Sequence, residues 1–154
     1  SAGLIGEMYN YLNIGIGYTL PFATFEEEWV DADRLKEVLD SYEVPGIAWR
    51  TVHYKPTSGR LSGKLIHGVQ YYYTDYEAAT ITLTQFYVMQ AVWELYGKNP
   101  FVLSAERIPM FNKVCGTDFV SNTFGQSLKV SDIADFWCAD AETFKRLSTK
   151  YYLY

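Results

Sequence analysis

The sequence predicts a single domain of the α/β class, with a small mixed sheet and several helices packed as α+β layers. Two stretches rich in β-branched and aromatic residues follow each other at residues 46–54 and 64–74, and helical patterns flank them. No linker, repeat or low-complexity tract divides the 154 residues. A chain of this length buries about 70% of its unfolded surface, so its core needs no metal or disulfide.

Composition excludes several protein classes. Apolar residues make up 49% of the chain and charged residues 20%, whereas a disordered chain is poor in apolar and rich in charged residues. The net charge of −5 argues against binding to the nucleic-acid backbone, which requires a positive field. The chain holds 14 Tyr, 9 Phe and 4 Trp, which fit either a ring-rich core or a surface that stacks on flat ligands.

No membrane span is expected. The longest uncharged run, residues 78–93, has sixteen residues and several Thr and Gln, and a span needs about 20 apolar residues. A buried helix is the better interpretation. The chain begins Ser-Ala-Gly with no signal-peptide core, so we expect any export signal to lie outside these residues.

The first half of the chain contains the clearest elements. Asp31 is expected to cap a helix over residues 31–42, whose apolar face comprises Leu35, Val38, Leu39 and Tyr42. Strands are expected at 46–54 and 64–74, joined by a polar loop over 55–63. Gly68 inside the second strand predicts a bulge or a close backbone approach.

The second half contains mostly helices. A long buried helix is expected over residues 76–96, and shorter ones over 108–114 and 119–126. Ser131-Asp132 is expected to cap a helix over 133–137. In a last helix, 140–150, Phe144 and Leu147 are expected to point inward.

No complete catalytic set emerges from the residues. His53 and His67 converge if their strands are neighbours. Each could be a proton donor, a ligand or a hydrogen-bonded core residue, but no third metal ligand is near in the sequence. The acidic run 26–28 predicts a solvated turn with no carboxyl shielded enough to raise its pKa. Cys115 and Cys138 fit two buried small hydrophobic residues, with a single disulfide as the alternative.

The segment 13–22 predicts an irregular loop. Gly15 and Gly17 lie one residue apart and Pro21 follows, so the backbone is exposed or closely approached there. The pattern starts like a dinucleotide fingerprint, but the third glycine is missing and no helix is expected to follow. We therefore expect no nucleotide cofactor.

Short motifs follow one another in a specific order along nearly the whole chain. They are Gly15-x-Gly17 before Pro21-Phe22, Trp29-x-Asp31-Ala32, Val44-Pro45-Gly46-Ile47, Tyr54-x-Pro56-Thr57, Gly63, Gly68-Val69-Gln70, Thr74-Asp75, Phe111-x-x-Val114-x-Gly116-Thr117, Ile133 with Trp137, and Tyr151-Tyr152-Leu153-Tyr154. In order and spacing they resemble the C-terminal domain of the exo-β-N-acetylmuramidase family, bacterial glycoside hydrolases that act on cell-wall peptidoglycan.

The resemblance implies a two-domain enzyme that releases terminal N-acetylmuramic acid from the non-reducing ends of glycan chains. An N-terminal Rossmann-like domain would carry the catalytic acid, and residues 1–154 would form the C-terminal auxiliary domain closing one side of the cleft. It implies action in the cell envelope, as a periplasmic or exported protein. No position matches the family's catalytic acid, so we assign no catalytic residue, metal or cofactor to this chain.

One departure from the family pattern bears on the substrate. The family usually has Gly-Arg-Gly-Thr where this chain has Gly15-Ile16-Gly17-Tyr18, and an arginine would suit an anionic sugar. Either the glycan differs, or the loop is only structural, or Lys55, Arg60 or Lys64 supplies the charge.

We expect the two loops to line a carbohydrate-binding cleft. The expected substrate-binding residues are Asn13, Gly15, Gly17, Tyr18, Thr19, His53, Tyr54, Lys55, Thr57, Ser58 and Arg60. Two alternatives are a non-catalytic module that binds glycan or protein, and a packing domain whose rings are all core. Joint exposure of Tyr18, Trp49, Tyr54 and Tyr72 would favour binding, and scattered burial would favour packing.

Overall fold

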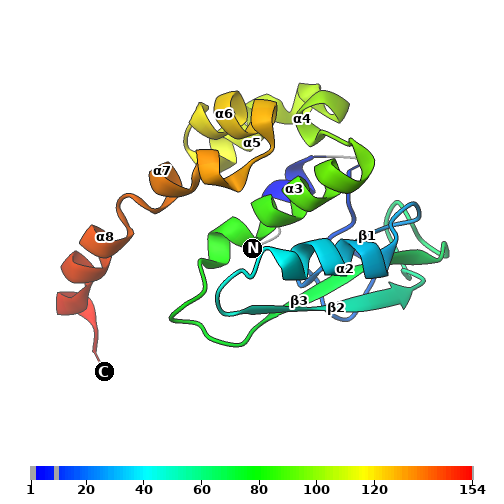
Figure 1. Cartoon of the computed structure of the whole chain (residues 1–154), viewed down its shortest axis with the longest axis horizontal. Helices are drawn as coiled ribbons and strands as arrows, with labels where there is room; N and C mark the ends of the chain where they lie inside the picture. Colours follow the sequence, from blue (N-terminus) through cyan, green and yellow to red (C-terminus); the bar gives the residue numbers. More distant parts are fainter. Residues whose placement is uncertain (1–2, 9–10, 154) are drawn as a thin grey trace.

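The protein is described by a computed structural model covering residues 3–8 and 11–153. Tyr154, the last residue of the motifs above, lies outside the described residues. Its sheet has three strands, β1 (Thr24–Glu27), β2 (Ile47–Tyr54) and β3 (Ile66–Tyr73), in the order β1-β3-β2. Both pairings are antiparallel. The predicted small sheet packed with several helices is confirmed (Figure 1), but its described strands are all antiparallel, so the expectation of a mixed sheet is wrong.

The helices form layers over the sheet. Helix α2 (Ala32–Ser41) packs on β2 and β3, and α3 (Thr84–Tyr96) packs beside α2 (Figure 1). The next layer contains α1 (Gly3–Glu7), α4 (Pro100–Leu103), α5 (Ile108–Cys115) and α6 (Phe119–Ser127). Helices α7 (Ala134–Cys138) and α8 (Ala141–Ser148) lead away toward the C-terminus, and 3-10 turns occur at Ile81–Leu83, Ala105–Arg107, Val130–Asp132 and Thr149–Tyr151.

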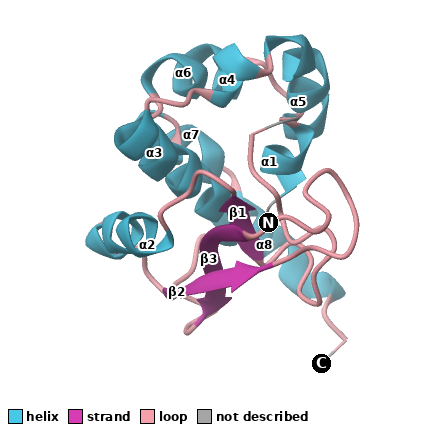
Figure 2. Cartoon of the chain, turned by 90° about the vertical axis from the view of Figure 1, so that its right-hand side faces the viewer, coloured by secondary structure: helices cyan, strands magenta, loops and turns pink. Residues whose placement is uncertain are grey.

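The two faces of the sheet have different surroundings. Trp49, Val69 and Tyr71 belong to the hydrophobic core on the face that α2 covers. Because side chains alternate along a strand, Glu26 and Tyr54 point to the other face. Figure 2 shows loops gathered on the side of the sheet away from α2. The alternation therefore places a carboxyl and a phenol under those loops.

Most of the predicted elements are confirmed. Asp31 caps α2, since its Oδ1 accepts a hydrogen bond from the Arg34 backbone N–H at 3.1 Å. Gly68 lies in regular register, and a Cβ there would be 2.0 Å from the Phe25 carbonyl oxygen, so the close approach is the correct alternative. Both cysteines are free and half-buried, and burial raises the pKa of the Cys115 thiol to about 11.

Two predicted helix starts are wrong. The long helix begins with a 3-10 turn at Ile81 and not at residue 76, because Asp75 Oδ1 accepts hydrogen bonds from the backbone of Glu77 and Ala78 and holds a turn. Residues 131–132 do not cap α7. They lie in a 3-10 turn, and Ile133 occupies the N-cap position.

The predictions for two side-chain environments are also wrong. The acidic run is not a solvated turn, because Glu26 and Glu27 lie in β1 and are buried. Phe144 and Leu147 do not point inward, and their exposed fractions are 70% and 56%. No helix in the described part of the chain is long and apolar enough to span a membrane.

Candidate functional site

The loops 13–22 and 55–63 are joined by hydrogen bonds. The carbonyl oxygen of Gly17 accepts a hydrogen bond from the Thr57 backbone N–H at 2.9 Å and another from its Oγ1 at 3.1 Å. The second loop is closed by a bond from the Gly63 N–H to the Pro56 carbonyl oxygen at 2.8 Å. The two loops therefore form one structural unit at the end of β2.

Both glycines of the first loop are required by the backbone. Gly15 and Gly17 have φ values of 80° and 79°, in the left-handed region that favours glycine. A Cβ on Gly17 would be 2.6 Å from the Ser58 carbonyl oxygen, and one on Gly15 would be 2.6 Å from the Leu20 carbonyl oxygen. These glycines let the loop turn tightly and approach the loop 55–63.

Two tyrosine rings stack where the loops meet. The ring centroids of Tyr18 and Tyr54 are 4.0 Å apart, with 18° between their planes. They border an open hollow of about 510 Å³, which we call the loop hollow. It is lined by Gly17, Tyr18, Thr19, Tyr54, Lys55, Thr57 and Ser58. Such a mixture of rings, hydroxyls and one ammonium group suits a polar ligand with a flat apolar face.

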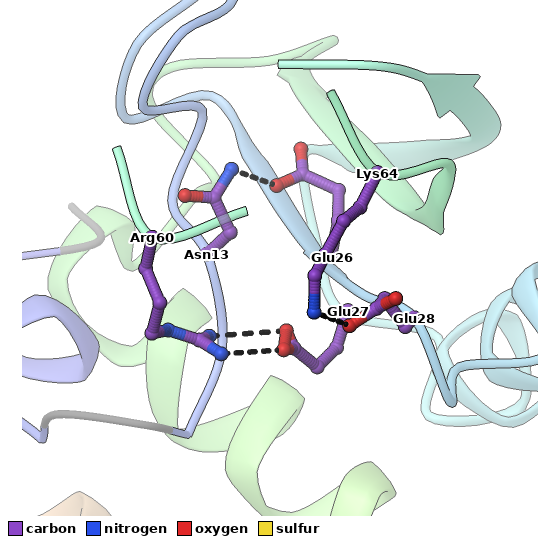
Figure 3. Close-up of polar contacts among 6 residues, drawn as sticks. All are labelled: Asn13, Glu26, Glu27, Glu28, Arg60 and Lys64. Carbon is purple, nitrogen blue, oxygen red and sulfur yellow. Dashed lines mark hydrogen bonds and ion pairs between the residues drawn. The ribbon is translucent and has the colours of Figure 1, made fainter. Parts of the chain in front are cut away.

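Glu26 lies buried beneath the rings. The Asn13 Nδ2 group donates to Glu26 Oε2 at 3.1 Å (Figure 3) and to the Tyr54 hydroxyl oxygen at 3.1 Å. The Gly15 N–H also donates to Glu26 Oε2, at 3.4 Å, while Glu26 Oε1 has no hydrogen-bond partner among the described residues. The carboxyl thus ties the glycine turn to Tyr54 through Asn13.

The burial of Glu26 changes its protonation. Removal from water raises the pKa of the Glu26 carboxyl from 4.5 to about 7, although the neighbouring polar groups of Thr24, Tyr54, Asn13 and Gly15 act in the opposite direction. Burial, and next the charge of Glu26, raises the pKa of the Tyr54 hydroxyl as well. The expectation that no carboxyl of the run 26–28 is shielded enough for such a shift is wrong.

Two of the three basic residues offered as replacements for the family arginine have acidic partners. Arg60 makes a bidentate pair with the buried Glu27, at 2.8 and 3.0 Å, and Lys64 Nζ lies 2.7 Å from Glu28 Oε2 (Figure 3). Lys55 lines the loop hollow, and no ion pair of Lys55 occurs among the described residues. It is therefore the residue best placed to meet an anionic group there.

The structure brings together most of the predicted binding residues. Gly17, Tyr18, Thr19, Tyr54, Lys55, Thr57 and Ser58 line the loop hollow. Asn13 and Gly15 lie beneath it on Glu26. Arg60 lies apart, beside a second hollow of about 270 Å³ that Ile16 also lines. Whether these residues bind a glycan stays a prediction.

His53 is not part of this cluster. It points to the sheet face that α2 covers, where its Nδ1 lies 2.8 Å from the Nδ1 of His67. The predicted convergence of the histidines is confirmed. Among the described residues, no group of three or more His, Cys, Asp or Glu side chains could hold a metal ion. The geometry thus favours a hydrogen-bonded pair.

The four aromatic residues whose exposure distinguishes binding from packing are divided between the surface and the core. Tyr18 and Tyr54 are half-buried and stacked at the loop hollow, and Tyr72 is exposed on the sheet. Trp49 lies in the core. The aromatic residues therefore serve both a core and a surface.

Sequence reasoning missed the buried Glu26. Its strand has only four residues, Thr24–Glu27, and all four are buried, so it lacks the alternation of polar and apolar residues that marks a strand. Consecutive carboxylates are ordinarily a solvent-exposed feature. No local signal distinguished Glu26 from a surface residue.

Comparison with known families agrees with this architecture. The family model described as the C-terminal domain of exo-beta-N-acetylmuramidase NamZ matches residues 1–154. The chain belongs to this family. The resemblance found in the motifs is thereby confirmed.

Relatives of this NamZ C-terminal domain are longer proteins. The chain is 27% identical over 140 residues to the peptidoglycan beta-N-acetylmuramidase NamZ of Bacillus subtilis (strain 168), covering 91% of this chain and 33% of that protein. A crystal structure of a DUF1343 family protein from Bacteroides fragilis superposes with a TM-score of 0.89 at 37% identity. That match covers 99% of this chain and 40% of the other. The chain thus spans well under half of either relative.

Proposed function

We propose that residues 1–154 are the C-terminal auxiliary domain of a longer exo-β-N-acetylmuramidase that removes terminal N-acetylmuramic acid from peptidoglycan glycans. An N-terminal Rossmann-like domain of the same protein would carry the catalytic acid. The protein would act in the cell envelope, in the periplasm or after export. Membership of the NamZ C-terminal family and the name of the Bacillus subtilis relative support this proposal.

The single observation that carries the proposal for this chain is the loop hollow. The Tyr18 and Tyr54 rings offer an apolar surface against which a sugar ring can pack. Thr57 and Ser58 offer hydroxyls to the hydroxyls of the glycan. Lys55 can pair with the carboxylate of muramic acid, as a charge-assisted hydrogen bond in place of the family arginine.

The bond-breaking step is assigned to the other domain. Glycoside hydrolysis needs a carboxyl that reaches the scissile bond. Glu26 has a raised pKa, but its side chain is fully buried under the loops, and Glu27 is paired with Arg60. The role we propose for Glu26 is to hold Asn13 and Tyr54 in place, as a positioning residue.

The first test compares two proteins with a chromogenic N-acetylmuramide substrate. One is the 154-residue chain, and the other is the complete open reading frame with the segment upstream. Turnover by the longer protein alone is the expected result. Turnover by the 154 residues alone would contradict the assignment of the catalytic acid to the other domain.

The second test concerns Lys55 in the complete protein. Lys55→Ala is expected to lower kcat/KM at least tenfold, mainly through KM, because a charge-assisted hydrogen bond contributes about 1.5–3 kcal/mol. Lys64→Ala is the matched control, since Lys64 pairs with Glu28 and is expected to leave both constants unchanged. Equal effects of the two substitutions would contradict the role of Lys55.

A second candidate is a non-catalytic module that binds glycan or protein. It is favoured by one observation, the exposed Ile16 at the position where the family has arginine. It predicts no turnover by the complete protein but retained binding of peptidoglycan fragments by the chain. Ile16→Arg would then be the variant expected to restore recognition of muramic acid.

A further inference from the structure

The C-terminal helix carries an apolar stripe that the rest of the described chain leaves uncovered. Ala141, Phe144 and Leu147 recur every three residues on one side of α8, and Tyr151 continues the stripe one turn later. Phe144 and Leu147 are 70% and 56% exposed, and Tyr151 is 72% exposed. A helix with this pattern ordinarily packs its apolar side against another surface.

The base of this segment is firmly attached to the body. Ile133 is fully buried, and the Trp137 indole N–H donates to Thr82 Oγ1 at 2.7 Å. The Trp137 ring also meets Phe86 edge-on, with centroids 5.0 Å apart. Beyond Cys138, every residue from Ala139 to Leu147 is exposed, and Figure 1 shows α8 standing away from the body. We call residues 139–153 the C-terminal arm.

The relatives of this chain contain a large additional segment that could cover the stripe. The chain covers 33% and 40% of its two longer relatives, and the matched family is the C-terminal domain. The remainder of such a protein therefore precedes this domain on the same polypeptide. The base of the arm is firmly attached, so the apolar stripe is held in one place. A covalently linked domain is always present beside it and can cover it permanently.

We propose that the C-terminal arm is a docking element that packs its Phe144–Leu147–Tyr151 stripe into an apolar groove of the preceding domain. The inference rests on the proposed two-domain organisation. Arg146 and Lys150 flank the stripe, so the groove is expected to have an acidic rim. The arm then fixes how the loop hollow faces the other half of the cleft.

The test is hydrogen–deuterium exchange of residues 141–151 in the complete protein and in the 154-residue chain. We expect exchange at least tenfold slower in the complete protein, because docking protects amides that are otherwise exposed. The variant Phe144→Ser/Leu147→Ser is expected to abolish this protection. The matched control Glu142→Ser/Thr149→Ser, which leaves the stripe and its flanking cations in place, is expected to keep it.

Three results would overturn the proposal. The first is an equal exchange rate of residues 141–151 in the two proteins. The second is loss of protection in the control variant but not in the Phe144→Ser/Leu147→Ser variant. The third is protection of the isolated chain that increases with its concentration. The last would identify a second copy of the chain as the occupant. Muramidase turnover is measured on the same samples, so protection without turnover would retain the docking and reject the proposed activity.

Discussion

At the residue scale, Glu26 is the group whose chemistry differs most from its ordinary behaviour. Its carboxyl lies on the sheet face beneath the loops and accepts hydrogen bonds from Asn13 and the Gly15 N–H, while its other oxygen has no partner in the described part of the chain. An ionised carboxylate is costly in such a place, because water no longer solvates it. A protonated carboxyl avoids that cost. The stability of the loop region should therefore depend on the pH near neutrality.

The direction of this pH dependence follows from the raised pKa of Glu26. The folded-state pKa of Glu26 is about 7, above its ordinary value of 4.5, so folding favours the protonated form. This contribution is fully present below pH 4.5 and is lost as the pH rises through 7. At pH 8.5 the free energy of unfolding of Glu26→Gln is expected to exceed that of the wild type by about 3 kcal/mol at most. At pH 4.5 the two free energies are expected to be nearly equal. Urea denaturation at both pH values measures these free energies. The same difference between variant and wild type at the two pH values would contradict the assignment of the shift to Glu26.

At the element scale, the glycine loop is built by backbone contacts that only glycine permits. The motif Gly15-x-Gly17 could be recognised from the sequence as an irregular loop. Its bonding to the loop 55–63 could not, because the Gly17–Thr57 contact joins residues 40 positions apart. Helix 32–41 was predictable from its local hydrophobic period, and the strands 47–54 and 66–73 from their β-branched and aromatic residues. The strand β1 was not, since it has four buried residues and no period.

Two glycines of these loops provide a matched pair of substitutions. Gly17→Ala is expected to destabilise the protein by about 3 kcal/mol, since it combines a left-handed φ with a Cβ placed 2.6 Å from the Ser58 carbonyl oxygen. Gly63→Ala has a similar φ of 76° but no atom within 4 Å, so about 1 kcal/mol is expected. Thermal unfolding of both variants measures the difference. Equal losses would show that the contact between the loops contributes nothing.

At the scale of the whole molecule, the chain divides into a packed body and an arm. The helical pattern of residues 140–150 correctly predicted a helix with an apolar side. The prediction that this side packs inward was wrong, because Phe144 and Leu147 are exposed and pack against no described surface of this chain. A periodic pattern shows that a helix has a partner and does not identify the partner. In the proposed docking, that partner is the preceding domain.

The division predicts how truncations of the 154-residue chain behave. Removing the residues after Ala139 deletes only α8 and the exposed residues beyond it, so the Tm is expected to stay within about 2 °C of the parent chain. Removing the residues after Val130 also deletes the buried Ile133 and the Trp137 contacts with Thr82 and Phe86. That loss is expected to cost about 4 kcal/mol and to lower the Tm by about 10 °C. Calorimetry of both truncated chains checks this, and a large loss from the shorter deletion would mean that the arm contributes to the core. In the complete protein the same short deletion is expected to destabilise the junction of the two domains, because the docking stripe is then absent.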